Sequence, residues 1–140
     1  MPRIEFYVLA SDTLAERQRV ACNLAMKAWR AGFNVFLRAS GEDECNVLDE
    51  LLWHFRKDCF LPHSQYEDNN SAPVVIGLDQ APSHPSGVLI NLASNLSPQV
   101  DHFSRVIEIV NQQPELLTAC RENFRTYRQR GYDPKRVELQ

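Results

Sequence analysis

The chain has 140 residues, a net charge of −3, and a composition of 44% hydrophobic and 24% charged residues. These values predict one globular domain over residues 1–140 and exclude a disordered chain. No apolar run approaches the roughly 20 residues that cross a bilayer, and the segment after Met1 does not resemble a signal peptide, so we expect a cytoplasmic protein without membrane contact.

The charge is distributed unevenly along the chain. Residues 115–140 carry a net charge of +2, whereas residues 1–114 carry −5. Proteins that bind duplex DNA through its phosphates are usually basic, so the overall charge argues against that function. A basic end on an acidic body instead suggests a local anionic partner.

The first half of the chain alternates predicted strands and helices. Residues 4–9 are rich in aromatic and β-branched types and predict a buried strand. Ser11-Asp12 offers N-caps for a helix that the apolar spacing predicts over residues 13–31. Residues 33–37 predict a second strand. A second helix is expected to begin at Ser40, because three acidic residues follow and complement a helix dipole.

The second half contains further strands and one long helix. Residues 59–61 are expected to form a short strand, and residues 63–71 an exposed loop. Three more strands are predicted by their β-branched composition: 74–76, 88–92 and 103–110. A last helix is predicted over residues 114–131, and the tail 132–140 is expected to be loosely docked. The alternation predicts a three-layer α/β/α sandwich with a mainly parallel sheet.

Motifs of the common catalytic and cofactor sites are missing. The junction after the first predicted strand contains no glycine, so the phosphate loop of a nucleotide-binding α/β domain is not encoded. No serine lies in a G-x-S-x-G motif, and the histidines share no metal-ligand spacing. The cysteines, Cys22, Cys45, Cys59 and Cys120, lack zinc or redox spacing and are expected to be small buried side chains. We expect no catalytic residues, no metal and no cofactor.

An apolar stripe and a basic stripe lie side by side on the predicted last helix. The apolar residues recur at helical spacing: Leu117, Cys120, Phe124 and Tyr127. The basic residues do the same: Arg121, Arg125 and Arg128. The simpler interpretation is a solvated face beside a core face. The functional interpretation is a groove that binds an acidic peptide carrying a hydrophobic anchor or a terminal carboxylate.

Two other apolar features have both a structural and a functional interpretation. Trp53 lies about 120° from the apolar stripe of its helix, at 100° per residue. It therefore either covers a second interface within the fold or is exposed as a binding anchor. The run from Cys59 to His63 is either a buried edge strand or an exposed patch for a partner.

Four segments of the chain resemble the chi-subunit family of bacterial DNA polymerase III holoenzyme in their sequence, order and spacing. They are residues 4–9 (IEFYVL), 49–53 (DELLW), 60–63 (FLPH) and 121–131 (RENFRTYRQRG). The resemblance covers nearly the whole chain. It implies a non-catalytic accessory subunit of the clamp-loader complex in DNA replication, located with the replisome in the cytoplasm, and a mononucleotide-binding type of fold without the nucleotide site.

The resemblance also implies two partners. The family binds the acidic C-terminal tail of the single-stranded DNA-binding protein, which ends in hydrophobic residues and a free carboxylate. By position, the pocket for this tail would contain Arg121 as the main carboxylate partner, with Val110, Phe124, Arg125 and Trp53 around it. The psi subunit would bind at Phe60, with Leu61 and Pro62 beside it, and a helicase-like repair protein is a further candidate for that surface.

One departure from the family pattern affects the expected pocket. Leu117 stands where a further basic residue is expected, one turn before Arg121. Recognition is then expected to depend more on Arg125 and Arg128, or the tail binds more weakly. Phe124 stands where the family also has an aromatic residue with a hydroxyl group, so it keeps the apolar wall and loses one hydrogen bond.

Two other classes of function are compatible with the residues. One is direct binding of single-stranded DNA by the basic helix, with Phe124 and Tyr127 stacking on bases, although the net charge opposes it. The other is a degenerate nucleotide-dependent hydrolase or transferase, which the missing phosphate loop opposes. The resemblance favours an adaptor between proteins, without direct contact to nucleic acid.

Overall fold

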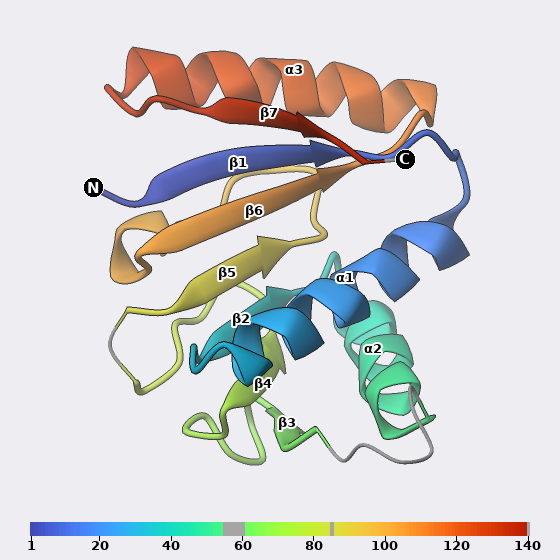
Figure 1. The fold of residues 1–140 in the computed structure, drawn as a ribbon, viewed down its shortest axis with the longest axis vertical. Helices are drawn as coiled ribbons and strands as arrows, with labels where there is room; N and C mark the ends of the chain where they lie inside the picture. The colour runs from blue at the N-terminus through green and yellow to red at the C-terminus, as the bar shows by residue number, and fades with distance from the viewer. Residues whose placement is uncertain (55–60, 85, 140) are drawn as a thin grey trace.

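The computed structural model describes residues 1–54, 61–84 and 86–139. Within these ranges, seven parallel strands form one sheet in the order β3-β4-β2-β5-β6-β1-β7 (Figure 1). The strands are β1 Arg3–Val8, β2 Val35–Arg38, β3 His63–Gln65, β4 Val74–Gly77, β5 Val88–Asn91, β6 Arg105–Val110 and β7 Lys135–Glu138. The helices are α1 Leu14–Arg30, α2 Glu42–His54 and α3 Pro114–Gln129, with a 3-10 turn, η1, at Val100–His102.

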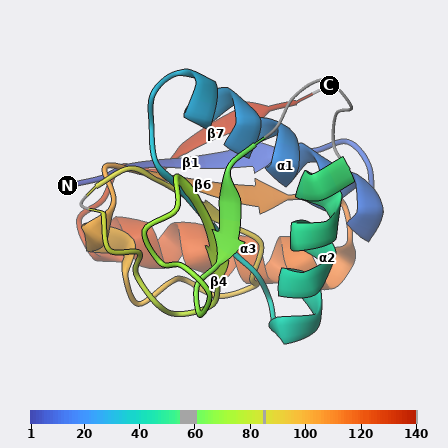
Figure 2. The same ribbon diagram turned by 90° about the horizontal axis from the view of Figure 1, so that it is seen from below.

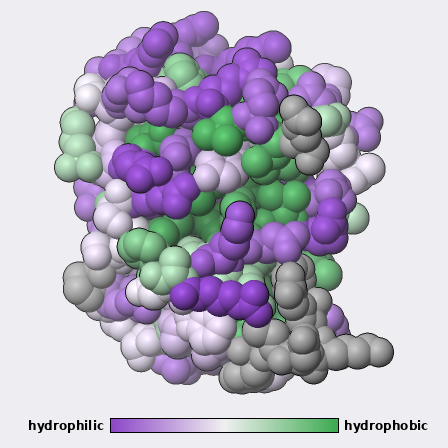
Figure 3. Space-filling view, in the orientation of Figure 1, coloured by the Kyte–Doolittle hydropathy of each residue, from purple (hydrophilic) through white to green (hydrophobic). Residues whose placement is uncertain are grey.

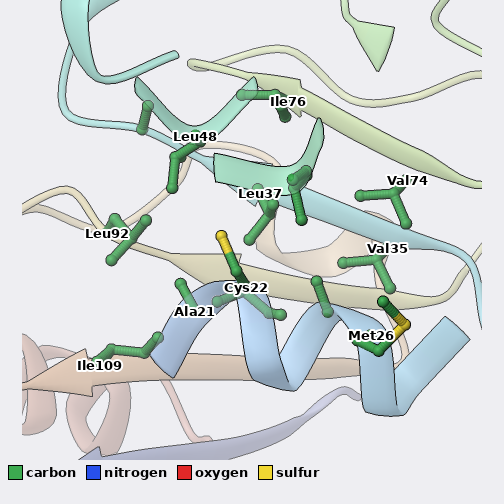
Figure 4. Close-up of a cluster of buried hydrophobic side chains, with 14 of the residues drawn as sticks. Ala21, Cys22, Met26, Val35, Leu37, Leu48, Val74, Ile76, Leu92 and Ile109 are labelled. Carbon is green, nitrogen blue, oxygen red and sulfur yellow. The ribbon is translucent and has the colours of Figure 1, made fainter. Parts of the chain in front are cut away.

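The helices cover both faces of the sheet, as the predicted α/β/α sandwich requires. Side chains of α1 and α2 form one core with alternate residues of the central strands (Figure 4). Side chains of α3 form a second core with the intervening residues of the same strands. Figure 2 shows α1 and α3 on opposite sides of β1 and β6. The predicted three-layer fold is confirmed, and every strand pair is parallel.

The face that carries α1 is not fully closed by helices. Figure 3 shows this side in the orientation of Figure 1, with hydrophobic side chains gathered near its centre and hydrophilic ones around them. Several apolar side chains of the first core, such as Leu24 and Leu139, remain half-buried. Three neighbouring strands, β4, β2 and β5, are buried along their whole length, as expected for parallel strands covered on both faces.

Local sequence explains where the longer helices begin and end. The Thr13 hydroxyl accepts a hydrogen bond from the Glu16 backbone N–H and caps α1, so the cap lies one residue after the predicted Ser11-Asp12. The Gln113 side chain caps α3 in the same way, and Pro114 follows at the first helical position. Gly131 lies just after α3 with φ +92°, a conformation that favours glycine.

Both edges of the sheet differ from the prediction. His63–Gln65, expected in a loop, forms the edge strand β3 beside β4. Of the strand expected at 59–61, only Leu61 lies within the described residues, and it is not in a strand. Lys135–Glu138, expected in a loosely docked tail, pairs with β1 as β7. Edge strands are held by backbone hydrogen bonds and carry polar side chains, so hydrophobic periodicity does not reveal them.

A buried polar network attaches α3 to the carboxyl ends of the strands. Tyr127 Oη donates to Glu108 Oε2 at 2.7 Å, and Asn91 Nδ2 donates to Glu108 Oε1 at 2.8 Å. Arg38 Nη1 donates to Asn91 Oδ1 at 3.2 Å. Burial raises the pKa of Glu108 to about 7, although its hydrogen bonds and the arginines oppose the shift. This network sets the position of α3 over the sheet.

Candidate functional site

A cavity of about 350 Å³ lies between α3 and the part of the sheet formed by β6, β1 and β7. We call it the α3 cavity. Its lining comes from four elements and the loop after β6: Phe6, Val8, Val110, Gln112, Leu117, Cys120, Arg121, Phe124 and Arg136. Elements far apart in the sequence therefore build one concave surface.

The floor of the α3 cavity is apolar and well packed. Phe6 and Val8 alternate along β1 and are buried, and Val110 at the end of β6 is buried beside them. The Phe6 ring lies 5.2 Å from the Phe124 ring and 5.9 Å from the Tyr127 ring, measured between centroids. These tilted and edge-on aromatic contacts hold the Phe124 wall in place.

The rim of the α3 cavity carries cations, while its floor stays neutral. Arg121 is exposed on α3, and among the described residues no carboxylate forms an ion pair with it. Arg136 approaches from β7 and forms an ion pair with Glu138 at 2.6 Å. Burial raises the pKa of the Cys120 thiol to about 12, so this side chain is uncharged at neutral pH. The cavity thus combines an apolar floor with guanidinium donors at its edge.

Three of the predicted tail-binding residues meet at the α3 cavity: Val110, Arg121 and Phe124. Leu117, the departure from the family pattern, lines the cavity as well, one turn before Arg121. Its apolar side chain extends the neutral floor where a basic residue would add a charge.

The other two predicted arginines lie on α3 but do not line the α3 cavity. Arg125 Nη1 forms an exposed ion pair with Glu122 at 3.0 Å. The Arg128 guanidinium lies over the Phe124 ring, 5.3 Å from its centroid. A cation in this position supports the ring that forms the cavity wall.

Trp53 is not brought to the α3 cavity. It lies on α2, which packs on the opposite face of the sheet from α3. Its side chain is 53% exposed, and its ring lies edge-on to the His63 ring with centroids 4.8 Å apart. Because α2 packs with α1 in one core and α3 packs in the other, the sheet separates Trp53 from the α3 cavity.

The predicted psi-facing residues have different environments. Phe60 lies outside the described residues. Leu61 is 1% exposed and belongs to the core beneath α1 and α2, so it cannot contact a partner directly. Pro62 is half-buried, and its carbonyl oxygen accepts a hydrogen bond from the Val74 N–H.

Sequence reasoning missed four residues of the cavity lining: Phe6, Val8, Gln112 and Arg136. Strand alternation places Phe6 and Val8 on one face, so period-two patterning was the signal for them. Gln112 Nε2 donates to the Leu9 carbonyl at 2.9 Å and closes the end of the cavity. No sequence pattern placed Arg136 at the cavity, because the strand that carries it, β7, was not predicted.

The structure also bears on the alternative functions. Tyr127 is fully buried and donates to Glu108, so it cannot stack on a base. Within the described ranges, no cluster of three or more His, Cys, Asp or Glu side chains is arranged to hold a metal ion. None of the helices in the described part of the chain is both long and apolar enough to span a membrane.

Comparisons with known proteins extend these observations. The sequence model of the family "DNA polymerase III chi subunit, HolC" matches residues 1–135. A DNA polymerase III subunit chi of Pseudomonas aeruginosa is 43% identical over 132 residues, which cover 94% of this chain and 93% of that protein. The subunit chi of Escherichia coli is 29% identical over 140 residues, covering 95% of each chain.

Among solved structures, a DEAD box protein from Methanococcus jannaschii has a similar fold, with a TM-score of 0.65 and 12% sequence identity. The match covers 97% of this chain and only 42% of that protein, and at this identity it concerns the fold alone. The family match and the curated relatives, in contrast, extend over nearly the whole sequence. The chain therefore belongs to the family of DNA polymerase III chi subunits.

Proposed function

We propose that the chain is an accessory subunit in DNA replication whose α3 cavity binds the acidic C-terminal tail of single-stranded DNA-binding protein. The hydrophobic end of the tail would enter the apolar floor over Phe6, Val8 and Val110. Its terminal carboxylate would accept hydrogen bonds from the Arg121 guanidinium at the rim. The observation that carries this proposal is the meeting, on α3, of an apolar cavity and an arginine that has no carboxylate partner among the described residues.

The expected affinity is moderate. One charge-assisted contact and one small pocket correspond to a dissociation constant in the micromolar range. Several tails on one DNA-bound partner would raise the effective concentration, and single contacts could still exchange quickly. Acidic side chains of the tail would add an attraction that salt screens.

The carboxylate-binding role is tested with two peptides that differ only at their ends. Both are acidic and end in two apolar residues; one has a free C-terminal carboxylate and the other a C-terminal amide. We expect calorimetry to give at least about tenfold weaker binding for the amide, because it removes the charge that Arg121 recognises. Equal affinity of the two peptides would contradict the proposal.

A substitution at Leu117 tests whether an added positive charge increases the affinity for the peptide. Leu117→Lys places a cation one turn before Arg121 at the edge of the α3 cavity. We expect about threefold tighter binding of the carboxylate peptide, the size of a partly exposed ion pair, with a steeper dependence on salt. The matched variant Leu117→Gln, which is polar without charge, should not bind more tightly than the parent. Tighter binding by both variants would mean that charge is not responsible.

We further propose that the psi subunit binds the segment around Phe60 and Pro62, on the resemblance to the family alone. Phe60→Ala is expected to weaken co-elution with psi by about tenfold, the effect of truncating an aromatic interface residue. The same variant should bind the tail peptide with unchanged affinity, because α3 lies on the other face of the sheet from α2, the helix that precedes this segment. Unchanged co-elution would refute this mapping. A helicase-like repair protein that binds the same surface should lose affinity in parallel.

A further inference from the structure

We infer that Arg136 on β7 is a second recognition residue of the α3 cavity, specific for an acidic side chain of the bound tail, and that Glu138 competes for it. The inference rests on the proposed function, because it assigns part of the same ligand. Residue 136 lies just beyond the span that the family model matches, residues 1–135. The assignment therefore depends on the geometry of this chain.

Arg136 reaches the α3 cavity because β7 pairs in parallel with β1. In this register Arg136 lies opposite Phe6, and Glu138 lies opposite Val8. Paired residues in adjacent strands point to the same face of a sheet, and Phe6 and Val8 belong to the core beneath α3. Arg136 thus stands on the α3 face and lines the cavity.

Two cations of different origin therefore flank one apolar floor. Arg121 comes from α3 and Arg136 from the sheet edge, and both line the same cavity of about 350 Å³. A tail with a terminal carboxylate and preceding acidic side chains carries at least two anionic groups. If Arg121 holds the terminal carboxylate, Arg136 is the remaining cation of the lining for a second anionic group, since Leu117 is apolar.

Glu138 is the internal competitor for Arg136. Arg136 Nη2 lies 2.6 Å from Glu138 Oε1, and the two side chains are 65% and 60% exposed. An incoming carboxylate must replace or share this contact, and the Glu138 charge repels it. Because the pair is exposed, its strength is small enough for a ligand to compete.

Lys135 provides a matched control. It is the neighbouring residue on β7, it is cationic, and it forms an exposed ion pair with Asp133 at 3.0 Å. Successive strand residues point to opposite faces, so Lys135 lies on the face away from α3. Lys135→Ala and Arg136→Ala therefore remove the same charge from the same strand on different faces.

The experiment measures binding of the full chain to two peptides by fluorescence anisotropy. One peptide is acidic with a free C-terminal carboxylate; the other keeps this carboxylate but has its acidic side chains replaced by the corresponding amides. We expect Arg136→Ala to weaken binding of the acidic peptide about threefold and binding of the amide-substituted peptide by a clearly smaller factor. Glu138→Gln should tighten binding of the acidic peptide about twofold. Most of this gain in affinity should vanish in the double variant Arg136→Ala, Glu138→Gln. Lys135→Ala should have little effect on either peptide.

Each other outcome has a definite meaning. Unchanged binding by Arg136→Ala, or an equal loss in Lys135→Ala, overturns the inference, since general charge would then explain the result. An equal loss for both peptides overturns the assignment to acidic side chains. If the unmodified protein binds neither peptide, the proposed function itself is contradicted, which is distinct from failure of the inference. Thermal unfolding of each variant is the control for the fold, and we expect the exposed substitutions on β7 to leave the melting temperature nearly unchanged.

Discussion

Arg121→Ala is expected to weaken binding of the carboxylate-terminated tail peptide by about 30-fold. Hydrogen bonds to charged groups contribute about 1.5–3 kcal/mol each, and the substitution removes the guanidinium while the peptide carboxylate loses its partner. Arg121 is exposed and has no carboxylate partner among the described residues, so its loss should leave the free energy of unfolding nearly unchanged. Titration calorimetry at fixed ionic strength, with urea unfolding in parallel, measures both quantities.

Two further variants distinguish geometry from charge at this position. Arg121→Lys keeps the charge but loses the planar fork of donors, so we expect an intermediate loss of affinity. Arg19→Ala removes one charge from α1, on the opposite face of the sheet, where Arg19 is exposed and paired with Glu16. This control should bind like the parent. Parent-like binding by Arg121→Ala, or an equal loss in Arg19→Ala, would show that the α3 cavity is not the binding site.

The second large effect is a dependence of stability on pH that originates at Glu108. Burial raises the pKa of this carboxyl from 4.5 to about 7 in the folded chain, against the opposing effects of Tyr127, Asn91 and the nearby Arg38 and Arg17. The folded state therefore binds the proton more tightly than the unfolded state does. The stabilisation is fully present below about pH 4.5 and is lost as the pH rises through 7. This difference corresponds to about 3 kcal/mol between pH 4 and pH 8.

Glu108→Gln isolates this contribution, because the amide does not titrate and fills nearly the same space. Its side-chain oxygen and nitrogen can retain contacts with Asn91 and with the Tyr127 hydroxyl. We expect urea unfolding at several pH values to show that the free energy of unfolding of the variant, relative to that of the parent, rises by about 3 kcal/mol from pH 4 to pH 8. The other ionisable groups are common to both proteins, so their contribution cancels in the difference. Parallel stability curves would mean that Glu108 does not titrate in this range.

Local sequence patterns predicted the part of the cavity lining that a single helix contributes. The apolar and basic stripes of α3 placed Phe124 and Arg121 on adjacent lines of one helix, and the structure brings both to one cavity. Val110 was expected there from the resemblance and lies at the end of β6, beside them. Trp53 was also assigned to this pocket, and the structure places it on the other face of the sheet. The face on which a helix packs depends on the crossover between strands, which leaves no mark in the helix itself.

The three-layer α/β/α architecture and the membership in the chi-subunit family could both be predicted from the amino-acid sequence, because strand and helix periodicities are local and the matching segments extend along nearly the whole chain. The set of residues that surround the cavity, in contrast, depends on contacts between elements far apart in the chain. Arg136 reaches it through pairing of β7 with β1, and Glu108 acquires a raised pKa because α3 closes over it. Edge pairing uses backbone groups that every residue has, and burial depends on neighbours far apart in the chain. Neither is encoded in the spacing of side chains along one element.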